Sequence, residues 1–193
     1  MSHAQPTLKT RRLHLLPAET SWASAMLDFQ LRNREHLAQW DPVPGDMFYT
    51  QLYWTMRLRQ RAKDWMDGHG AAFLLMLEEQ PGQVVGSVAL SNVVRGRLQS
   101  GTLSYALDAS LQGQGLMREA LEAVIALAFD DMRLHRIQAN YQPANLRSAG
   151  LLQRLGFCIE GEAKDYLYIN GAWRDHVLTA RCNPDFDASQ MIG

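Results

Sequence analysis

A glycine-containing segment, Gln112-Gly113-Gln114-Gly115-Leu116-Met117, constrains the fold of this chain more than any other feature. It follows a strand-like run, Leu103 to Asp108, and precedes a helix-like run, Arg118 to Phe129. Glycine lets the backbone approach a ligand without interference from a Cβ, and the N–H groups that open a helix have no intrahelical acceptors, so they can bind an anion. The segment therefore favours a loop that holds a pyrophosphate, although a Gly-x-Gly before a helix is more often only a tight turn.

The segments downstream of this loop favour the binding site over the tight turn. A second strand-like run, His135 to Tyr141, is followed by Asn145 to Ser148, which open another helix that ends near Leu155 to Phe157. A helix that connects two strands of one sheet makes those strands parallel, so we expect 103–108 and 136–141 to be parallel neighbours. Their carboxyl ends would then face the ligand.

The order, residue types and spacing of these segments resemble the GNAT family of acetyl-CoA-dependent N-acetyltransferases. The phosphate loop of that family runs Gln/Arg-x-x-Gly-x-Gly/Ala, and its downstream helix carries Asn-x-x-Ser or Asn-x-x-Ala before Gly-Phe. Met117 departs from the Gly or Ala of the general pattern, which a backbone-only contact tolerates when the side chain points away. Leu8 to Leu13 resembles the opening strand of the family. Within the family the chain resembles the RimJ-type ribosomal-protein alanine N-acetyltransferases, over the segments Ser91 to Gly96, Gln112 to Ala120, Asn140-Tyr141, Lys164 to Tyr166 and Asn170 to Val177.

The remaining sequence predicts an α/β (α+β) chain with a single domain. A chain of 193 residues, of which 47% are hydrophobic, is ordinary for one domain with a substantial core. Residue patterns predict helices over Glu19 to Trp40 and Gln51 to Trp65, and strands over Leu8 to Leu16, Ala72 to Glu78, Val84 to Leu90, Glu162 to Ile169 and Trp173 to Ala180. Together with the resemblance, this order predicts the GNAT fold, a central and mostly antiparallel mixed sheet with one splayed parallel strand pair, flanked by helices. We assign residues 1–182 to this domain and 183–193 to a polar C-terminal tail.

Charge and cysteine content argue against several other classes of protein. The formal net charge of -1 disfavours a general nucleic-acid binder, which usually needs a clustered basic excess. Cys158 and Cys182 form neither a metal-ligand spacing nor a disulfide framework, and no charged segment followed by an apolar stretch opens the chain. The longest apolar runs, Ala71 to Leu77 and Ala123 to Phe129, are far too short to span a membrane. We therefore expect a cytoplasmic protein without a metal, either a monomer or a homodimer.

The resemblance implies which residues hold acetyl-CoA. Its pantetheine arm would lie between the splayed strands and pair with the first of them, because strand backbone supplies donors and acceptors for its amides. Tyr105, Ala106 and Leu107 match that position. The pyrophosphate would be held by the loop residues Gln112, Gly113, Gln114, Gly115, Leu116 and Met117. Asn145 and Ser148 would also contact this co-substrate, although Asn145 equally suits a helix N-cap.

The implied reaction is direct attack of an amine on the thioester through a tetrahedral intermediate. Ser148 would protonate the departing thiolate, since Leu152 stands where many relatives have a tyrosine. A protein α-amino group with a pKa of about 8 is roughly one-tenth neutral at pH 7, so an N-terminal acceptor needs only a weak base. Water chains that end on Glu160, Asp165 or His176 could serve, and each of these equally suits an ordinary strand position.

The implied acceptor is the α-amino group of a protein, in particular the N-terminal alanine of a small-subunit ribosomal protein. Trp40, Tyr49, Asn92 and Tyr166 match regions that line the acceptor groove in relatives. Trp40 equally suits the buried end of an amphipathic helix.

Two other functions remain open from the sequence. An acetyltransferase for a small amine, such as a polyamine or an antibiotic, would share these motifs and have a more enclosed, acidic pocket. A non-catalytic acetyl-CoA-binding regulatory module would have lost part of them. A dinucleotide-binding domain does not fit, because no Gly-x-Gly-x-x-Gly follows an early strand and no series of βαβ units surrounds the loop.

Overall fold

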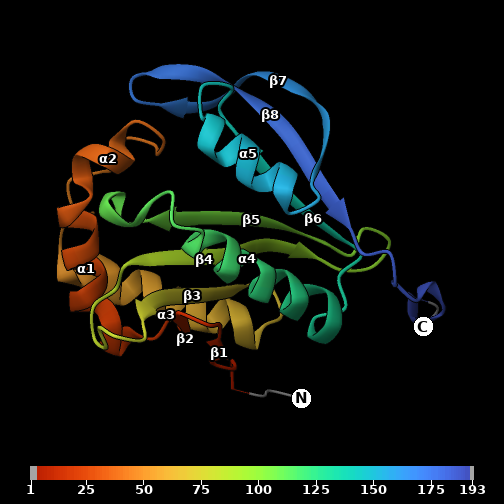
Figure 1. The fold of residues 1–193 in the computed structure, drawn as a ribbon, viewed down its shortest axis with the longest axis horizontal. Helices are drawn as coiled ribbons and strands as arrows, with labels where there is room; N and C mark the ends of the chain where they lie inside the picture. Colours follow the sequence, from red (N-terminus) through yellow and green to blue (C-terminus); the bar gives the residue numbers. More distant parts are fainter. Residues whose placement is uncertain (1–3, 192–193) are drawn as a thin grey trace.

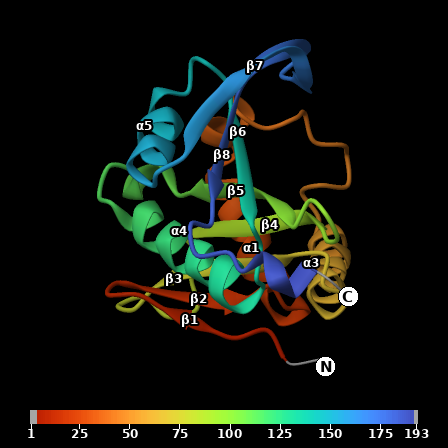
Figure 2. The same ribbon diagram turned by 90° about the vertical axis from the view of Figure 1, so that its right-hand side faces the viewer.

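The computed structural model describes residues 4–191 and shows one sheet with helices on both faces (Figure 1, Figure 2). Within these residues the sheet has eight strands in the order β1-β2-β3-β4-β5-β6-β8-β7. The strands are β1 (Leu8–Lys9), β2 (Leu13–Pro17), β3 (Ala71–Leu77), β4 (Gly86–Val94), β5 (Ser100–Leu107), β6 (Arg136–Tyr141), β7 (Cys158–Ile169) and β8 (Ala172–Cys182). The α-helices are α1 (Ala23–Arg32), α2 (Arg34–Ala38), α3 (Gln51–Met66), α4 (Leu116–Ala126) and α5 (Leu146–Arg154). Shorter helical turns are η1 (Thr20–Trp22), η2 (Ala109–Leu111), η3 (Leu127–Asp131) and η4 (Ala188–Met191).

Neighbouring strands pair antiparallel throughout this sheet, except for β5 and β6, which are parallel. The chain passes from β5 to β6 through α4, the connection that a parallel pair requires. The mixed sheet with a single parallel pair confirms the predicted fold class.

Both faces of the sheet are covered at β3. Ala71, Phe73 and Leu75 belong to the core shared with α4, whereas Ala72 and Leu74 belong to the core shared with α1 and α3. Successive strand side chains point to opposite faces, so a strand covered on both sides is apolar along almost its whole length. The helices bury residues spaced for one helical face: Met26 and Phe29 in α1, Trp54 and Leu58 in α3, and Leu116, Met117, Ala120, Leu121, Val124 and Ile125 in α4.

The first strand predicted from the sequence is divided. Instead of one strand over Leu8 to Leu16, the chain forms the hairpin β1–β2. The turn is closed by Thr10, whose N–H donates to the carbonyl oxygen of Leu13 at 2.9 Å. The sequence prediction of a single strand was therefore wrong at this turn.

The first predicted helix is also divided. The run Glu19 to Trp40 folds as η1, α1 and α2, with a break at Asn33, whose φ and ψ are -107° and 12°. Asn33 is 2% exposed, and its side-chain amide donates to Asp108 while its oxygen accepts from the N–H of Ala109. A contact with a distant part of the chain thus overrides helical periodicity.

The segment after β8 remains attached to the domain over its first residues. The N–H of Asn183 donates to the carbonyl oxygen of His135 at 2.8 Å, and the rings of Phe186 and His135 lie 5.1 Å apart. Residues 192–193 of the predicted tail, and residues 1–3 of the predicted domain, lie outside the described residues.

Candidate active site

The parallel strands β5 and β6 separate along their length. They pair only at Ser100↔Arg136, Gly101↔Ile137 and Thr102↔Gln138. Beyond this point β5 remains paired with β4 as far as Leu107, and β6 remains paired with β8 as far as Tyr141. The edge of β5 from residue 103 to 107 therefore has no strand partner on the β6 side. Unpaired backbone groups of this kind need a hydrogen-bond partner, and an extended ligand can supply it.

The loop that follows β5 opens α4. Gly113 and Gly115 have φ angles of 77° and 80°, which only glycine adopts readily, and Gly115 is the N-cap of α4. A Cβ built on Gly113 would meet nothing within 4 Å, so the backbone is open to an approaching group. Within the described part of the chain, the N–H groups of residues 113–117 make no hydrogen bond. The loop is therefore a set of free donors at the positive end of a helix.

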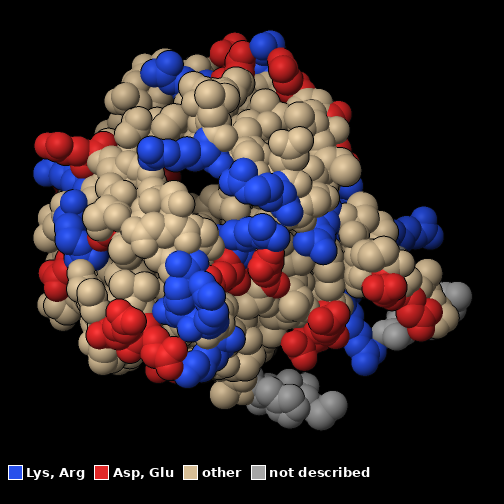
Figure 3. Space-filling view, in the orientation of Figure 1, with Lys and Arg blue, Asp and Glu red and all other residues tan. Residues whose placement is uncertain are grey.

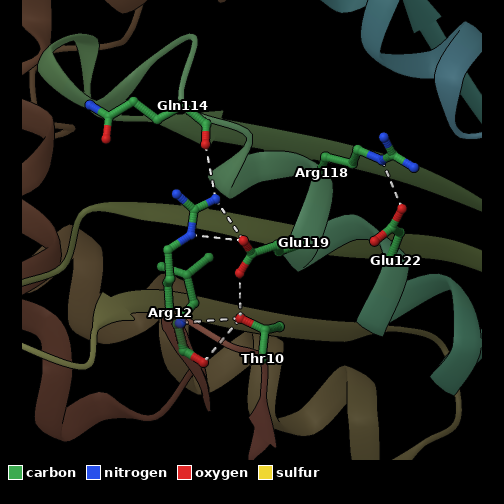
Figure 4. Close-up of polar contacts among 7 residues, drawn as sticks. Thr10, Arg12, Gln114, Arg118, Glu119 and Glu122 are labelled. Carbon is green, nitrogen blue, oxygen red and sulfur yellow. Dashed lines mark hydrogen bonds and ion pairs between the residues drawn. The ribbon is translucent and has the colours of Figure 1, made fainter.

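Arg12 holds this loop from below (Figure 4). Its Nη2 donates to the carbonyl oxygen of Gln114 at 2.9 Å, and its Nε donates to Oε1 of Glu119 at 2.8 Å. The hydroxyl of Thr10 donates to the other oxygen of Glu119 at 3.1 Å. Burial acts to raise the pKa of Glu119, but these hydrogen bonds outweigh it and lower the pKa. The carbonyl oxygen of Gln114 is thus bonded to Arg12, on the side of the loop that faces the domain. The N–H groups of the loop remain available to a ligand. The sequence alone did not predict this role of Arg12.

Asp108, at the start of the loop, is fixed by a second network. Its carboxylate accepts from Nε of Arg32 at 2.8 Å, from Nδ2 of Asn33 at 3.2 Å and from both the N–H and the hydroxyl of Ser110. Burial would raise the pKa of Asp108, but the hydrogen bonds from Arg32, Ser110 and Asn33 lower it to about 2. This network joins the α1–α2 junction to the loop and was also missed, because its members lie far apart in sequence.

Ser148 lies in the first turn of α5, where the side chain of Asn145 caps the helix by accepting from the Ser148 N–H at 3.1 Å. The Ser148 hydroxyl shares a hydrogen bond of 2.7 Å with the hydroxyl of Tyr105 on β5. Burial raises the pKa of Tyr105 to about 12, although the Ser148 hydrogen bond acts to lower it. The tyrosine therefore stays protonated at neutral pH. Tyr105 was predicted to contribute only its backbone, and its side-chain contact with Ser148 was not predicted.

Gln112 links the loop to helices on both sides. Its side-chain amide nitrogen lies 2.6 Å from Nε2 of His36, and its oxygen accepts from Arg147 of α5. Burial lowers the pKa of His36, as does the charge of Arg147, while the charge of Asp108 opposes them. An amide nitrogen only donates, so a neutral His36 accepts this bond through Nε2.

The three candidate proton acceptors have different surroundings. Glu160 forms an ion pair with Arg136, the first residue of β6 and so at the paired end of the parallel strands. Asp165 is exposed at an irregularity of β7 with a φ of 47°, and its N–H donates to Asp175. His176 is 5% exposed, and its Nδ1 lies 3.0 Å from the carbonyl oxygen of Arg174. A carbonyl only accepts, so in the neutral imidazole Nδ1 carries the proton and Nε2 has the lone pair.

The predicted acceptor-groove residues do not form one contiguous cluster of contacts. Tyr166 accepts a hydrogen bond from Asn140 at 3.2 Å, and its ring lies 5.2 Å from that of His176, so these residues meet near the carboxyl end of β6. Tyr49 packs under the guanidinium of Arg34. Asn92 has a φ of 51° at the irregularity in β4, and Trp40 is half-buried after α2.

A hollow lies over β5 between α4 and α5 on the face shown in Figure 3, and Lys and Arg side chains gather along its margin. The arginines of these two helices are Arg118, Arg147 and Arg154. Arg118 pairs with Glu122 of its own helix at 2.8 Å (Figure 4). A basic margin suits a ligand with several phosphates.

Within residues 4–191, no group of three or more His, Cys, Asp or Glu side chains is placed to hold a metal ion. No helix in that range has the length and hydropathy needed to cross a membrane.

A family model described as an acetyltransferase (GNAT) domain matches residues 12–158. The chain belongs to the GNAT acetyltransferase family. This confirms the family predicted from the glycine loop and the Asn145–Ser148 motif, and with it an enzyme of acyl transfer.

Several relatives of this GNAT acetyltransferase match it over most of its length. It is 40% identical over 180 residues to the ribosomal protein uS5-alanine N-acetyltransferase of Escherichia coli strain K12. The aligned region covers 93% of this chain and 92% of that protein. The structure of a ribosomal-protein alanine acetyltransferase from Vibrio fischeri is 37% identical with a TM-score of 0.91, covering 95% of this chain and 100% of that one. Mycobacterium smegmatis RimJ in complex with CoA-disulfide is 28% identical with a TM-score of 0.84, covering 97% and 89%. The predicted resemblance to RimJ-type enzymes is confirmed.

Proposed function

We propose that this enzyme transfers the acetyl group of acetyl-CoA to the α-amino group of a protein N-terminus, specifically an N-terminal alanine of a small-subunit ribosomal protein. One observation carries the proposal: the free edge of β5 lies between a loop of unbonded N–H groups and the hydroxyl of Ser148. The 40% identity with the Escherichia coli enzyme supports the choice of acceptor.

The residues present fit acetyl-CoA. The N–H groups of residues 113–117 would hold its pyrophosphate, and the open space around Gly113 leaves that backbone accessible. The unpaired backbone of Tyr105, Ala106 and Leu107 would hold the pantetheine amides. Met117 is 7% exposed and belongs to the core, so its side chain does not obstruct the loop.

Acetyl-CoA supplies the acetyl group as a thioester and leaves as a thiol. Ser148 would donate a proton to the departing sulfur, and Tyr105 would replenish or orient that proton through the shared hydrogen bond. A backbone N–H near Leu107 would stabilise the oxyanion. Of the candidate bases, His176 is best suited, since Nε2 of its neutral ring would have a lone pair for the proton and the ring contacts Tyr166 at the acceptor side.

An α-amine is a better acceptor for this site than a lysine side chain. About one-tenth of a protein α-amino group is neutral at pH 7, against under a thousandth of a lysine, so a weak base such as a histidine suffices. A ribosomal acceptor would place the enzyme in the cytoplasm. It would contact a protein N-terminus without reading nucleic-acid sequence, and as a monomer or homodimer.

Thiol release from acetyl-CoA with three acceptors tests this proposal. The acceptors are a peptide beginning with alanine, the same peptide with a blocked N-terminus and a free lysine, and spermine. We expect turnover with the free alanine terminus alone. Turnover with spermine or with the lysine peptide instead would refute transfer to an α-amine.

A further inference from the structure

A cavity of about 230 Å³ lies on the face of the sheet that α1 and α3 cover. Small side chains of three adjacent strands form its floor: Ala72 of β3, Ser87 and Ala89 of β4, and Ser104 and Ala106 of β5. These residues are cross-strand partners, so they make one continuous surface. Small side chains leave space beneath a helix that larger ones would fill, which accounts for the cavity.

The helix α3 covers this floor with one face that is only partly apolar. Trp54, Arg57, Leu58 and Arg61 line the cavity, at positions i, i+3, i+4 and i+7. A helical face with this spacing normally packs apolar side chains onto a sheet. Two of these four residues are arginines, so the face combines packing with positive charge.

Trp54 has an unsatisfied polar group at this place. The residue is 7% exposed, and its Nε1–H has no hydrogen-bond partner among the described residues. The rings of Phe48 and Tyr53 pack against it with centroids 5.1 and 5.3 Å away, and both residues also line the cavity. A buried donor without an acceptor is costly, so a ligand group that accepts a hydrogen bond would be favoured here.

Neither arginine forms a close ion pair. Arg57 is exposed and has no ion pair within residues 4–191, and Nη1 of the half-buried Arg61 lies 4.0 Å from the carboxylate of Asp64. Burial lowers the pKa of Arg61, and the nearby charge of Arg57 lowers it further. Guanidinium groups stay charged even so, and like charges one helical turn apart repel each other. An anion between them would relieve this repulsion.

One acidic residue also lines the cavity. Asp41 lies between α2 and α3, and although much of the residue is exposed, burial of its carboxyl group raises its pKa. Its charge opposes that of the arginines, which outnumber it. The cavity therefore carries a net positive charge on its helical wall, with the carboxyl of Asp41 on another segment.

We propose that this cavity binds an acidic side chain of the acceptor peptide, a few residues behind its N-terminus, with the carboxylate held by Arg57, Arg61 and the indole N–H of Trp54. The inference rests on the proposed function. The strand β5 supports it, because Ser104 and Ala106 form part of the floor while the free edge of the same strand faces the acyl-transfer site. An extended peptide advances about 3.3 Å per residue, so each of the second, third and fourth positions presents its side chain at a different distance from the N-terminus.

The inference is tested by changing the charge of one residue in the acceptor peptide and of one residue in the enzyme. Peptides begin with alanine and carry glutamate, glutamine or lysine at the second, third or fourth position, and kcat/KM is measured by thiol release. At one position we expect glutamate to be preferred over glutamine by about 10-fold, the size of a charge-assisted hydrogen bond. Arg57→Glu should reverse the order, so that the lysine peptide becomes the better acceptor. Trp54→Phe, which keeps a ring and removes the N–H, should reduce the preference for glutamate.

Arg59→Glu is the matched control. Arg59 is exposed, as Arg57 is, but it lies two residues further along and so about 200° around the helix, and it does not line the cavity. The Arg59→Glu variant changes the net charge by the same amount as Arg57→Glu, and in it the preference for the glutamate peptide should persist. Equal turnover of the glutamate, glutamine and lysine peptides overturns the inference and leaves the proposed function intact, as does a glutamate preference that survives Arg57→Glu. Failure of every peptide with a free α-amine overturns both.

Discussion

Tyr105 on β5 and Ser148 on α5 share a hydrogen bond of 2.7 Å between their hydroxyl groups. The bond connects the separated strand to the helix beside it, at the place where the sheet is open. Under the proposed function Tyr105 would be a positioning residue for Ser148: with the tyrosine as donor in this bond, the Ser148 hydroxyl proton stays available for the departing sulfur.

The first prediction concerns this pair. Ser148→Ala should lower kcat by about 10- to 100-fold, at the low end for a general acid because a thiolate leaves readily. Tyr105→Phe should lower kcat several-fold and leave the KM for acetyl-CoA nearly unchanged. If the two act as a unit, the double variant is no slower than Ser148→Ala alone. Multiplicative losses in the double variant, or an identical pH profile of kcat in all four proteins, would contradict the pairing.

The second prediction concerns Gly115. Its φ of 80° is strained for any β-branched residue, so Gly115→Val should distort the N-terminus of α4 and weaken acetyl-CoA binding by at least about 10-fold. Gly82→Val is the control, since Gly82 has a φ of 94° in the turn between β3 and β4, with open space around it. Calorimetric titration should show weaker binding in the first variant only. Unaltered affinity of Gly115→Val would count against the phosphate loop.

The third prediction concerns Arg12. Arg12→Ala removes the hydrogen bond to the Gln114 carbonyl and the ion pair with Glu119, so the loop is no longer held in position by this side chain. We expect the KM for acetyl-CoA to rise roughly 3- to 10-fold with kcat little changed, as for the loss of uniform binding. Arg11→Ala, at the neighbouring and exposed position, should behave like the parent enzyme. A fall in kcat alone would assign Arg12 to catalysis rather than to the loop.

The fourth prediction concerns acid stability. The pKa of Asp108 is lowered to about 2, against about 3.9 in an unfolded chain, so the carboxylate stabilises the fold at any pH above its unfolded pKa. This contribution, about 2 kcal/mol, is lost as the pH falls from about 4 to about 2. Urea unfolding should show Asp108→Asn less stable than the parent at pH 7, with a difference that shrinks below pH 4. Asp28→Asn, on the exposed side of α1, should follow the parent, and a gap for Asp108→Asn that stays constant with pH would rule out the charge as the cause.

The fifth prediction concerns His176. If its Nε2 accepts the amine proton, His176→Gln should lower kcat/KM near neutral pH, where most of the α-amine is protonated and needs a base. Activity should recover in part above pH 8, because the free amine then no longer needs a base. A loss of equal size at every pH would indicate that the residue only supports the fold.

The sequence by itself determined the local parts of the site. Gly113 and Gly115 could be assigned to a ligand loop because the left-handed backbone and the free N–H groups at a helix start depend on neighbouring residues alone. The strand predicted over Ala72 to Glu78 could also be read locally, because the apolar run of β3 is typical of a strand covered on both faces. The parallel pair followed from the order of strand, helix and strand.

The tertiary structure decided which side chains meet. The helix ends at Asn33, whose side chain donates to Asp108. Arg12 donates to the carbonyl oxygen of Gln114, which lies 102 positions further along the chain. The Tyr105–Ser148 bond and the arginines above the cavity floor also depend on how the sheet places distant segments side by side. A local pattern contains no information about such contacts, because their energy depends on a geometry that exists only after the sheet has formed.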